Sequence, residues 1–212
     1  MDNRIFLMQI IFSVITAVLA IVAVIISVAQ IHKSNKQALF DRRLNALLTV
    51  KWMLELCKNK VIKDYLEKLQ DNQLTSMNQF FKEMTNSRFF EEIQDIFDNI
   101  LNITYKRMFM RKLEELRSLV KEIVLIFPKN IGYEMADFVY YYSEMLVFIY
   151  KYQNSYDSMI NMRNKQKEST GDNSNIYSLW KNMMRYSNGT FTLAERLEKG
   201  FVLQKVEAKI KL

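Results

Sequence analysis

The hydrophobic pattern divides the chain into one uncharged run and a long remainder with helical periodicity. Residues 5–31 carry no charge over 27 positions, whereas a helix needs about 20 apolar residues to cross a bilayer. A cleaved signal peptide is the alternative, and Ser27-Val28-Ala29 has the small-x-small form of a cleavage site. The apolar region of a signal peptide is only about 7–15 residues long. The pattern therefore predicts a transmembrane helix over residues 5–31, preceded by a short extracytoplasmic N-terminus, residues 1–4.

Inside this run, the polar residues and two alanines recur at a regular spacing. Successive members are 4, 3, 4, 3, 4 and 3 positions apart, which places them on one helical face. Small residues let membrane helices approach closely, and polar side chains hydrogen-bond between helices. We expect a homo-oligomer in which this polar stripe forms a packed seam or, in a larger ring, lines a pore; the alternative is a single anchor that merely tolerates these residues. The polar stripe consists of Gln9, Ser13, Thr16, Ala20, Ala23, Ser27 and Gln30.

Beyond residue 31, apolar residues continue at helical spacing. They predict a juxtamembrane helix over residues 32–70 and a cytoplasmic helical bundle over residues 71–212. Asp71-Asn72-Gln73 is expected to be a turn, and residues 77–84 a short amphipathic helix. No Gly or Pro precedes Pro128, so the membrane helix can continue into the cytoplasm without an obligatory break.

The distal part of the bundle is expected to contain a helix hairpin. A long helix over residues 88–127, with a bend at 102–104, would be joined by residues 128–132 to an antiparallel return helix over residues 133–163. The polar segment 164–175 is expected to be a mobile loop. Ser187-Asn188-Gly189 is expected to be a turn that separates a helix over 176–186 from a last helix, which begins at Thr192 with a capping box to Glu195.

Composition supports an all-α fold. The chain has four Gly and one Pro in 212 residues, about 2.4%, where average usage is about 7% Gly and 5% Pro. Sandwiches, barrels and doubly wound sheets need turn residues at nearly every reversal. Half of the residues are hydrophobic, which excludes low-complexity disorder. The expected architecture is one N-terminal transmembrane helix that continues into a cytoplasmic helical bundle.

The charge pattern favours an anionic partner and fixes an expected orientation. The net charge is +7, and basic residues are frequent directly after the apolar run. The positive-inside rule therefore predicts an extracytoplasmic N-terminus and a cytoplasmic location for residues 32–212 at the cell (inner) membrane. We expect the first basic group to contact inner-leaflet headgroups. This group is Lys33, Lys36, Arg42 and Arg43.

A second basic group follows further along the chain. The default interpretation is a solvated helix face, and the alternatives are a face for a cytoplasmic protein partner or, less favoured, for nucleic acid. The segment 178–201 also has a helix-turn-helix outline, which is common in all-α chains. The second group is Lys106, Arg107, Arg111, Lys112, Arg117 and Lys121.

The residue types needed for common chemistries are scarce. Cys57 is the only cysteine and His32 the only histidine, which excludes an intrachain disulfide, a thiolate cluster and a zinc site with two or more histidines. The sequence has no Gly-rich phosphate loop and no nucleophile elbow. Two carboxylates in the aromatic return helix, Asp137 and Glu144, are each expected to be paired with a Lys, Arg or Tyr. We expect no catalytic residue, no metal and no cofactor.

Two stretches together resemble a group of uncharacterised bacterial single-pass membrane proteins. Residues 35–44 read NKQALFDRRL after the span, and residues 85–93 read TNSRFFEEI, with Tyr105-Lys106 further on. The group has an ALYDKR juxtamembrane helix, a T-x-x-S-x-F-L-F-x-x-x-I stretch and a Tyr-Lys. Here Phe40 replaces the usual Tyr, and Phe90-Glu91 replaces Leu-Phe. The resemblance covers residues 5–120 and implies no established activity.

These observations lead to one expected function and one principal alternative. We expect a non-enzymatic, membrane-anchored protein that self-associates through the polar stripe, in its strong form a membrane-permeabilising effector of the phage-defence kind. The alternative is a monomeric membrane-tethered scaffold or sensor whose bundle docks a protein. In the first case, the bundle would sense or dock a cytoplasmic protein partner or trigger.

Overall fold

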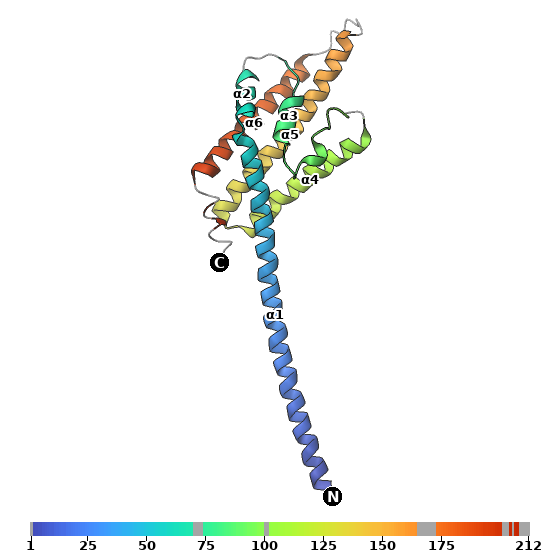
Figure 1. Cartoon of the computed structure of the whole chain (residues 1–212), viewed down its shortest axis with the longest axis vertical. Coiled ribbons are helices and arrows are strands. Elements are labelled where there is room, and N and C mark those ends of the chain that lie inside the picture. Colours follow the sequence, from blue (N-terminus) through green and yellow to red (C-terminus); the bar gives the residue numbers. More distant parts are fainter. Residues whose placement is uncertain are drawn as a thin grey trace. The chain divides into compact units, whose positions relative to one another are not determined.

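Helices make up nearly all of the structure, a computed structural model (Figure 1). It describes residues 2–69, 74–99, 102–164, 173–200, 204, 206 and 207. These ranges contain no strand, which confirms the all-α class. The helices are α1 (Asp2–Lys58), α2 (Lys60–Leu69), α3 (Asn78–Met84), the 3₁₀ helix η1 (Glu91–Ile93), α4 (Ile103–Ile126), α5 (Lys129–Asn164) and α6 (Asn173–Lys199).

The chain divides into two compact units, residues 1–42 and residues 43–212. The first unit is the N-terminal part of α1, and its described side chains are all exposed. The second unit contains the rest of α1 and every other helix. Helix α1 has no break at residues 33–35 and continues to Lys58. Because Asn59 separates it from α2, residues 32–58 belong to α1 and residues 60–69 form the next helix.

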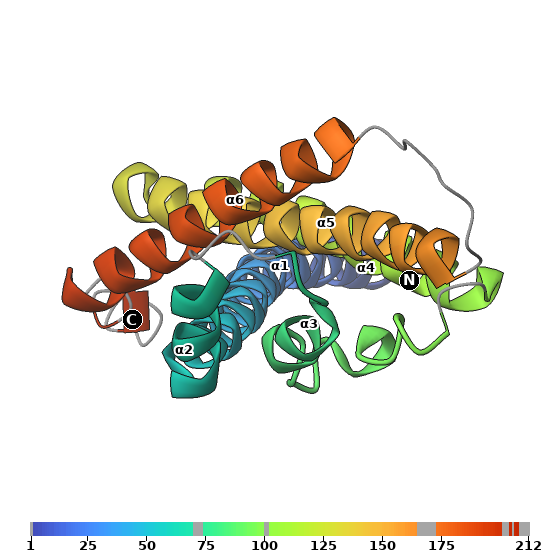
Figure 2. The same ribbon diagram turned by 90° about the horizontal axis from the view of Figure 1, so that it is seen from above.

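Helix α5 is at the centre of the second unit and packs against both α4 and α6 (Figure 2). Its residues Met135, Phe138, Val139, Tyr142 and Met145 are fully or almost fully buried. This 3-4 spacing gives a helix an apolar face toward its neighbours. The distal part of α1 contributes buried residues from Ala46 to Cys57 to the same core.

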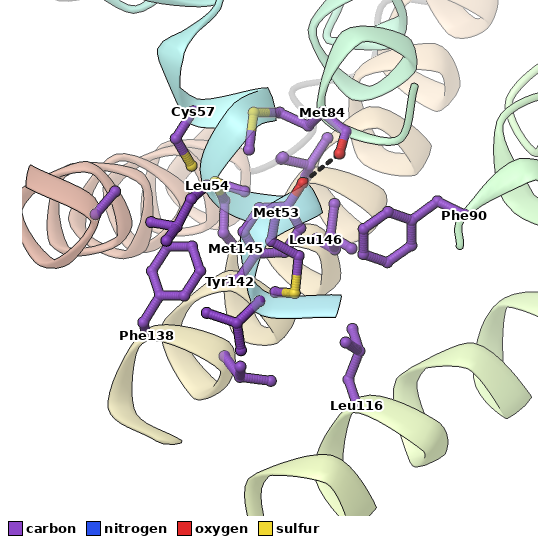
Figure 3. Packing of buried hydrophobic residues seen from close by; sticks show 14 of the residues in the cluster. Met53, Leu54, Cys57, Met84, Phe90, Leu116, Phe138, Tyr142, Met145 and Leu146 are labelled. Atoms are coloured by element: carbon purple, nitrogen blue, oxygen red, sulfur yellow. Dashed lines mark hydrogen bonds between the residues drawn. The ribbon is translucent and has the colours of Figure 1, made fainter. Parts of the chain in front are cut away.

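Tyr142 lies in the middle of this core (Figure 3). Its ring stacks on Phe90, with centroids 5.6 Å apart and planes inclined by 6°. Its hydroxyl donates a hydrogen bond to the carbonyl oxygen of Met84. Burial raises the pKa of the Tyr142 hydroxyl well above its ordinary value. One side chain thus joins α5 to the end of α3 and to the segment that follows it.

The expected helix hairpin is present, with a shorter connection than predicted. Helix α4 ends at Ile126, and α5 begins at Lys129 rather than Tyr133. Gly132 lies where the two helices meet, since a Cβ atom there would be 3.2 Å from the carbonyl oxygen of Ile123. Pro128 directly precedes α5. Its missing N–H costs no helical hydrogen bond there, because the first N–H groups of a helix have no acceptor within the helix.

The predicted long helix over residues 88–127 is wrong in its first part. Residues 88–99 form turns and the 3₁₀ helix η1, and α4 starts only at Ile103. Backbone bonds in this segment join residues three apart, as in Ile93 N to Phe90 O and Ile96 N to Ile93 O, at 2.9 and 3.2 Å. Successive three-residue turns keep apolar side chains on one side just as a helix does. Asn102, expected at a bend, is instead the N-cap of α4 and accepts from Thr104 N at 2.9 Å.

The predicted turn at residues 187–189 and the capping box at Thr192 are also wrong. Helix α6 continues through both positions, and Thr192 Oγ1 donates to Asn188 O at 2.8 Å within the helix. The small residues serve helix packing: a Cβ atom at Gly189 would lie 2.4 Å from the ring of Tyr141 on α5. Ser187 is fully buried on the same helix.

Two predicted connections fall largely outside the described residues. Helix α5 ends at Asn164 and α6 begins at Asn173, so most of the predicted loop 164–175 is not described. The predicted turn at Asp71-Asn72-Gln73 is not described either. The short helix expected over residues 77–84 is confirmed as α3, and it ends before Thr85 as predicted.

Candidate functional site

The polar stripe lies on one exposed face of α1. All seven of its side chains are exposed in the first unit, as expected for a helix whose environment is lipid or other copies of itself. Large apolar side chains such as Val18, Val22 and Ile25 are exposed around the rest of the helix. A solvated helix would not expose so much apolar surface. The stripe is therefore a polar line on an otherwise lipid-compatible surface.

The three hydroxyl groups of the polar stripe already have hydrogen-bond acceptors within α1. Ser13 Oγ donates to Gln9 O at 2.9 Å, Thr16 Oγ1 to Phe12 O at 2.8 Å, and Ser27 Oγ to Ala23 O at 2.8 Å. This pattern of bonding to the carbonyl four residues earlier is usual for Ser and Thr within helices. It uses the hydroxyl proton and leaves oxygen lone pairs free to accept. A single helix can thus place these hydroxyls in lipid at little cost.

The side-chain amides of Gln9 and Gln30 differ from the hydroxyls. Neither donates a side-chain hydrogen bond to any residue that the structure describes. An amide without a partner is costly in hydrocarbon. Gln9 and Gln30, near the two ends of the apolar run, therefore require interfacial water or a neighbouring helix. Between them, Ala20 and Ala23 offer the least steric obstacle to a second helix.

The first basic group divides between the two units. Lys33, Lys36 and Arg42 are exposed on the first unit and are free to contact headgroups. Arg43, the first residue of the second unit, is half-buried, and its Nε donates to Ile126 O at 2.7 Å. This bond satisfies a carbonyl at the end of α4, where four such groups lack helical partners. Arg43 thus holds the α4–α5 connection as well as adding positive charge.

The second basic group is solvated, as the default interpretation expects, at every position except Lys112. Lys112 is only 8% exposed, lies 2.6 Å from Glu115 Oε2, and stands 4.4 Å from the centre of the Phe89 ring. It must be removed from the predicted face, because its stem is packed and its charge is neutralised.

Two arginines of this group are also engaged. Arg111 pairs with Glu92, and Arg117 Nη2 lies 3.5 Å from Glu144 Oε1. The latter pair satisfies Glu144 as expected, whereas the expected pairing of Asp137 is wrong: it is exposed and makes no ion pair with any described residue. Three members, Lys106, Arg107 and Lys121, are exposed and make no ion pair with any residue in the described ranges. Such a thinned set gives little support to nucleic-acid binding, which needs many unpaired cations.

The residues behind the family resemblance have packing roles. Thr85 is fully buried and its Oγ1 donates to Phe81 O at 2.7 Å. Phe90 is fully buried against Tyr142. The buried residues of the stretch over residues 85–93 therefore close one side of the core, while Arg88, Glu91 and Glu92 are exposed.

Two surface features were not anticipated. One is an open groove of about 660 Å³ lined by Trp52 of α1 and Leu197 of α6, with Lys58 Nζ bridging to Glu198 Oε1 at 3.1 Å across it. Hydrogen bonds to Glu55 and Glu198 raise the pKa of Lys58. The other is Leu125, which is 83% exposed. The sequence could have indicated this exposure, because helical spacing places Leu125 on a different face of α4 from the buried residues Leu116 and Ile123.

Metal ligands do not gather in the described part of the chain. It contains no group of three or more His, Cys, Asp or Glu side chains that could hold a metal ion. Cys57 is buried in the core.

Comparison with protein-family models, curated proteins and solved structures finds no match to this chain. The fold and the polar stripe are therefore the basis for a functional proposal.

Proposed function

We propose that this protein is a membrane-anchored, non-enzymatic helical protein that self-associates through the polar stripe of α1. The observation that carries the proposal is the confinement of all polar side chains of residues 7–31 to one exposed face of an apolar helix. An anchor without partners gains nothing from that arrangement, whereas an oligomer buries it.

The membrane anchor is supported by the length and composition of α1. It is the one described helix that is long and apolar enough to cross a membrane, and none of its most apolar window is buried. The basic residues Lys33, Lys36 and Arg42 follow the apolar run. Before the run stand one basic residue, Arg4, and one acidic residue, Asp2. By the positive-inside rule, the second unit belongs on the cytoplasmic face of a bacterial inner membrane.

In its strong form, the proposal makes the protein an effector that permeabilises the membrane. A ring of several α1 helices would line a narrow lumen with Ser, Thr and Gln side chains. The second unit would dock a cytoplasmic partner or trigger. This is the behaviour of a phage-defence effector, which damages the membrane only when infection is sensed.

Crosslinking of the full-length protein in native membranes, followed by mass determination, tests self-association. Replacing Ser13, Thr16, Ala20 and Ala23 together with Leu should abolish crosslinked oligomers, because bulky side chains separate the helix backbones. The matched control replaces Val18 and Ala29 with Leu on the opposite side of α1, since successive residues are about 100° apart. The control should retain the oligomers of the wild type. Oligomers that survive the stripe replacement would contradict the proposal, and the measured mass separates dimer from ring.

The bonded hydroxyls of the stripe favour a second candidate, a monomeric anchor with a scaffold function. Since Ser13, Thr16 and Ser27 are satisfied within α1, a lone helix is stable in lipid. In this case the second unit docks another protein, and an unrelated membrane span can replace residues 5–31 without loss of function. A co-purified partner at fixed stoichiometry, together with monomeric crosslinking behaviour, would establish this alternative.

A further inference from the structure

The outer side of the α4–α5 hairpin is an exposed surface of apolar, aromatic and oppositely charged side chains. On α4, Lys121 and Leu125 are one turn apart, and on α5, Tyr133, Asp137 and Tyr140 follow each other at 4-3 spacing. Residues at such spacings share one side of a helix. All five are exposed in the second unit. We call them the hairpin surface.

Two contacts fix how the halves of this surface face each other. At one end, Gly132 lies against the carbonyl oxygens of Ile123 and Phe127. At the other, Arg117 lies 3.5 Å from Glu144. Helices α4 and α5 are antiparallel and packed together. Between these two contacts, each step toward the N-terminus of α4 therefore corresponds to a step toward the C-terminus of α5. Leu125 lies across from Tyr133, and Lys121 across from Asp137.

The composition of the hairpin surface is that of an interface. Leu125, at 83%, is more exposed than any other large hydrophobic side chain in the described ranges, and Tyr133 is 53% exposed. Exposed Tyr and apolar residues grouped together mark protein contacts. Lys121 and Asp137 make no ion pair or side-chain hydrogen bond with any residue that the structure describes. The surface thus carries one free charge of each sign beside its apolar centre.

We infer that the hairpin surface binds the same surface of a second copy of this chain, about a two-fold axis that runs along the hairpin between α4 and α5. A two-fold contact pairs each residue that lies off the axis with a different residue of the partner, and the two pairings are reciprocal. Lys121 then meets the partner's Asp137, and Leu125 meets the partner's Tyr133. Both charges find an opposite charge, and the apolar residues are covered. A charge pair arranged in this way is self-complementary, which is the requirement for a contact between identical chains.

This inference rests on the proposed self-association and extends it to the second unit. Arg43, where the chain enters that unit, is hydrogen-bonded to Ile126 at the end of α4. The hairpin surface therefore begins beside the residue that follows the first unit. Copies that associate through α1 are tethered, and a tether raises the effective concentration of a second contact to about millimolar for short linkers. A small surface is then sufficient.

A mixed disulfide in the full-length protein tests the contact. Two differently tagged chains are co-expressed in native membranes, one with Leu125→Cys and the other with Tyr133→Cys, and oxidised mildly. The parent, whose Cys57 is buried, supplies the background. We expect the two tags in one covalent dimer. Val61→Cys, also at an exposed apolar position but on α2, replaces Leu125→Cys as the control and should give only background.

Charge reversal makes the test specific. Lys121→Glu or Asp137→Lys in both chains should lower the disulfide yield at least about tenfold, because like charges then meet across the contact. Both reversals together should restore it, which a folding defect cannot do. A yield no higher than that of Val61→Cys, or a double reversal without restoration, would overturn the inference. Shielding of the cysteine at position 125 from a water-soluble maleimide without a disulfide would likewise overturn it, in favour of lipid or a foreign protein.

The same measurement separates this inference from the proposed function. In the variant with Ser13, Thr16, Ala20 and Ala23 replaced by Leu, a retained disulfide between positions 125 and 133 supports the hairpin contact even if self-association through the polar stripe is lost. Crosslinked oligomers without this disulfide support the stripe and overturn the hairpin contact.

Discussion

Tyr142 connects three parts of the core through a ring and a hydroxyl. The ring stacks on Phe90, and the hydroxyl donates to Met84 O. Tyr142→Phe keeps the ring and leaves a buried carbonyl without a donor. We expect the free energy of unfolding to fall by about 1–3 kcal/mol, measured by urea unfolding of the full chain in detergent. The control is Tyr177→Phe at an exposed position of α6, where a change within about 0.5 kcal/mol is expected; equal losses would contradict the role of the Met84 bond.

Gly189 offers a test in which the sign of the effect decides. In an exposed helix interior, Gly→Ala stabilises by about 1 kcal/mol. Here a Cβ atom would lie 2.4 Å from the ring of Tyr141, so Gly189→Ala should destabilise the protein, by about 1–3 kcal/mol as for other overpacked cores. Thermal unfolding measures the change. In a Tyr141→Ala background the penalty should vanish, and stabilisation by Gly189→Ala alone would show that α5 and α6 do not pack this closely.

At the scale of elements, an ion pair ties α3 to the turns that follow it. Lys82 Nζ lies 2.6 Å from Asp98 Oδ2, and Asn78 Nδ2 lies 3.3 Å from Asp98 Oδ1. These hydrogen bonds, that of Lys82 first, lower the pKa of Asp98 below its ordinary value of 3.8. The folded state therefore prefers the ionised carboxylate. The resulting stability is present above about pH 4 and is lost as the pH falls through the lowered pKa.

Asp98→Asn should remove this contribution. At neutral pH we expect a loss of about 0.2–1 kcal/mol, typical of an exposed pair, and the difference between variant and wild type should shrink as the pH falls below 3.8. Melting temperatures recorded between pH 7 and pH 3 measure it. Asp95→Asn, whose carboxylate is 3.8 Å from the same lysine, is the matched control with a smaller effect. A constant difference at all pH values would exclude ionisation as the cause.

The elements that sequence reasoning predicted correctly are those whose apolar residues recur at regular helical spacing. The uncharged run in α1, the short helix α3 and the hairpin of α4 and α5 belong to this class. The errors have a common physical origin, because small and polar residues are ambiguous. Ser187 and Gly189 resemble turn residues in the sequence. In the structure they are small because the ring of Tyr141 packs closely against α6. Three-residue turns between Phe90 and Ile96 imitate a helix, since both keep apolar residues on one side.

The candidate site could be predicted only in part, for similar reasons. The spacing of the polar stripe is visible in the sequence, but the bonding of Ser13, Thr16 and Ser27 to their own helix is not. Likewise, the packing of Lys112 against the Phe89 ring joins two segments of the chain, and no local pattern reveals it; only the pair with Glu115, three residues on, is local. The hairpin surface depends on which residues of α4 remain uncovered by α5, and this is a property of the pair.

At the scale of the whole molecule, the proposed self-association of α1 would enclose either a lumen or a dry seam. The polar stripe carries no charged residue, so a lumen formed by it would discriminate poorly between ions. Overproduction of an effector of this kind should dissipate the membrane potential. The hydroxyls of Ser13, Thr16 and Ser27 would keep such a lumen wet through their oxygen lone pairs, which remain free in α1.

Replacing these hydroxyls distinguishes the two arrangements. Ser13→Ala, Thr16→Val and Ser27→Ala preserve side-chain size closely, and because each hydroxyl proton is bonded within its own helix, helix contacts should survive. A lumen that loses its polar lining closes by dewetting. We therefore expect crosslinked oligomers at wild-type yield together with a loss of about tenfold or more in leak, measured with a potential-sensitive dye in cells that overproduce each variant. The control Ala29→Leu, on the opposite side of α1, should leak like the wild type. An unchanged leak would show that ions do not pass along the stripe, and the self-associated helices would then form a packed seam that anchors the second unit.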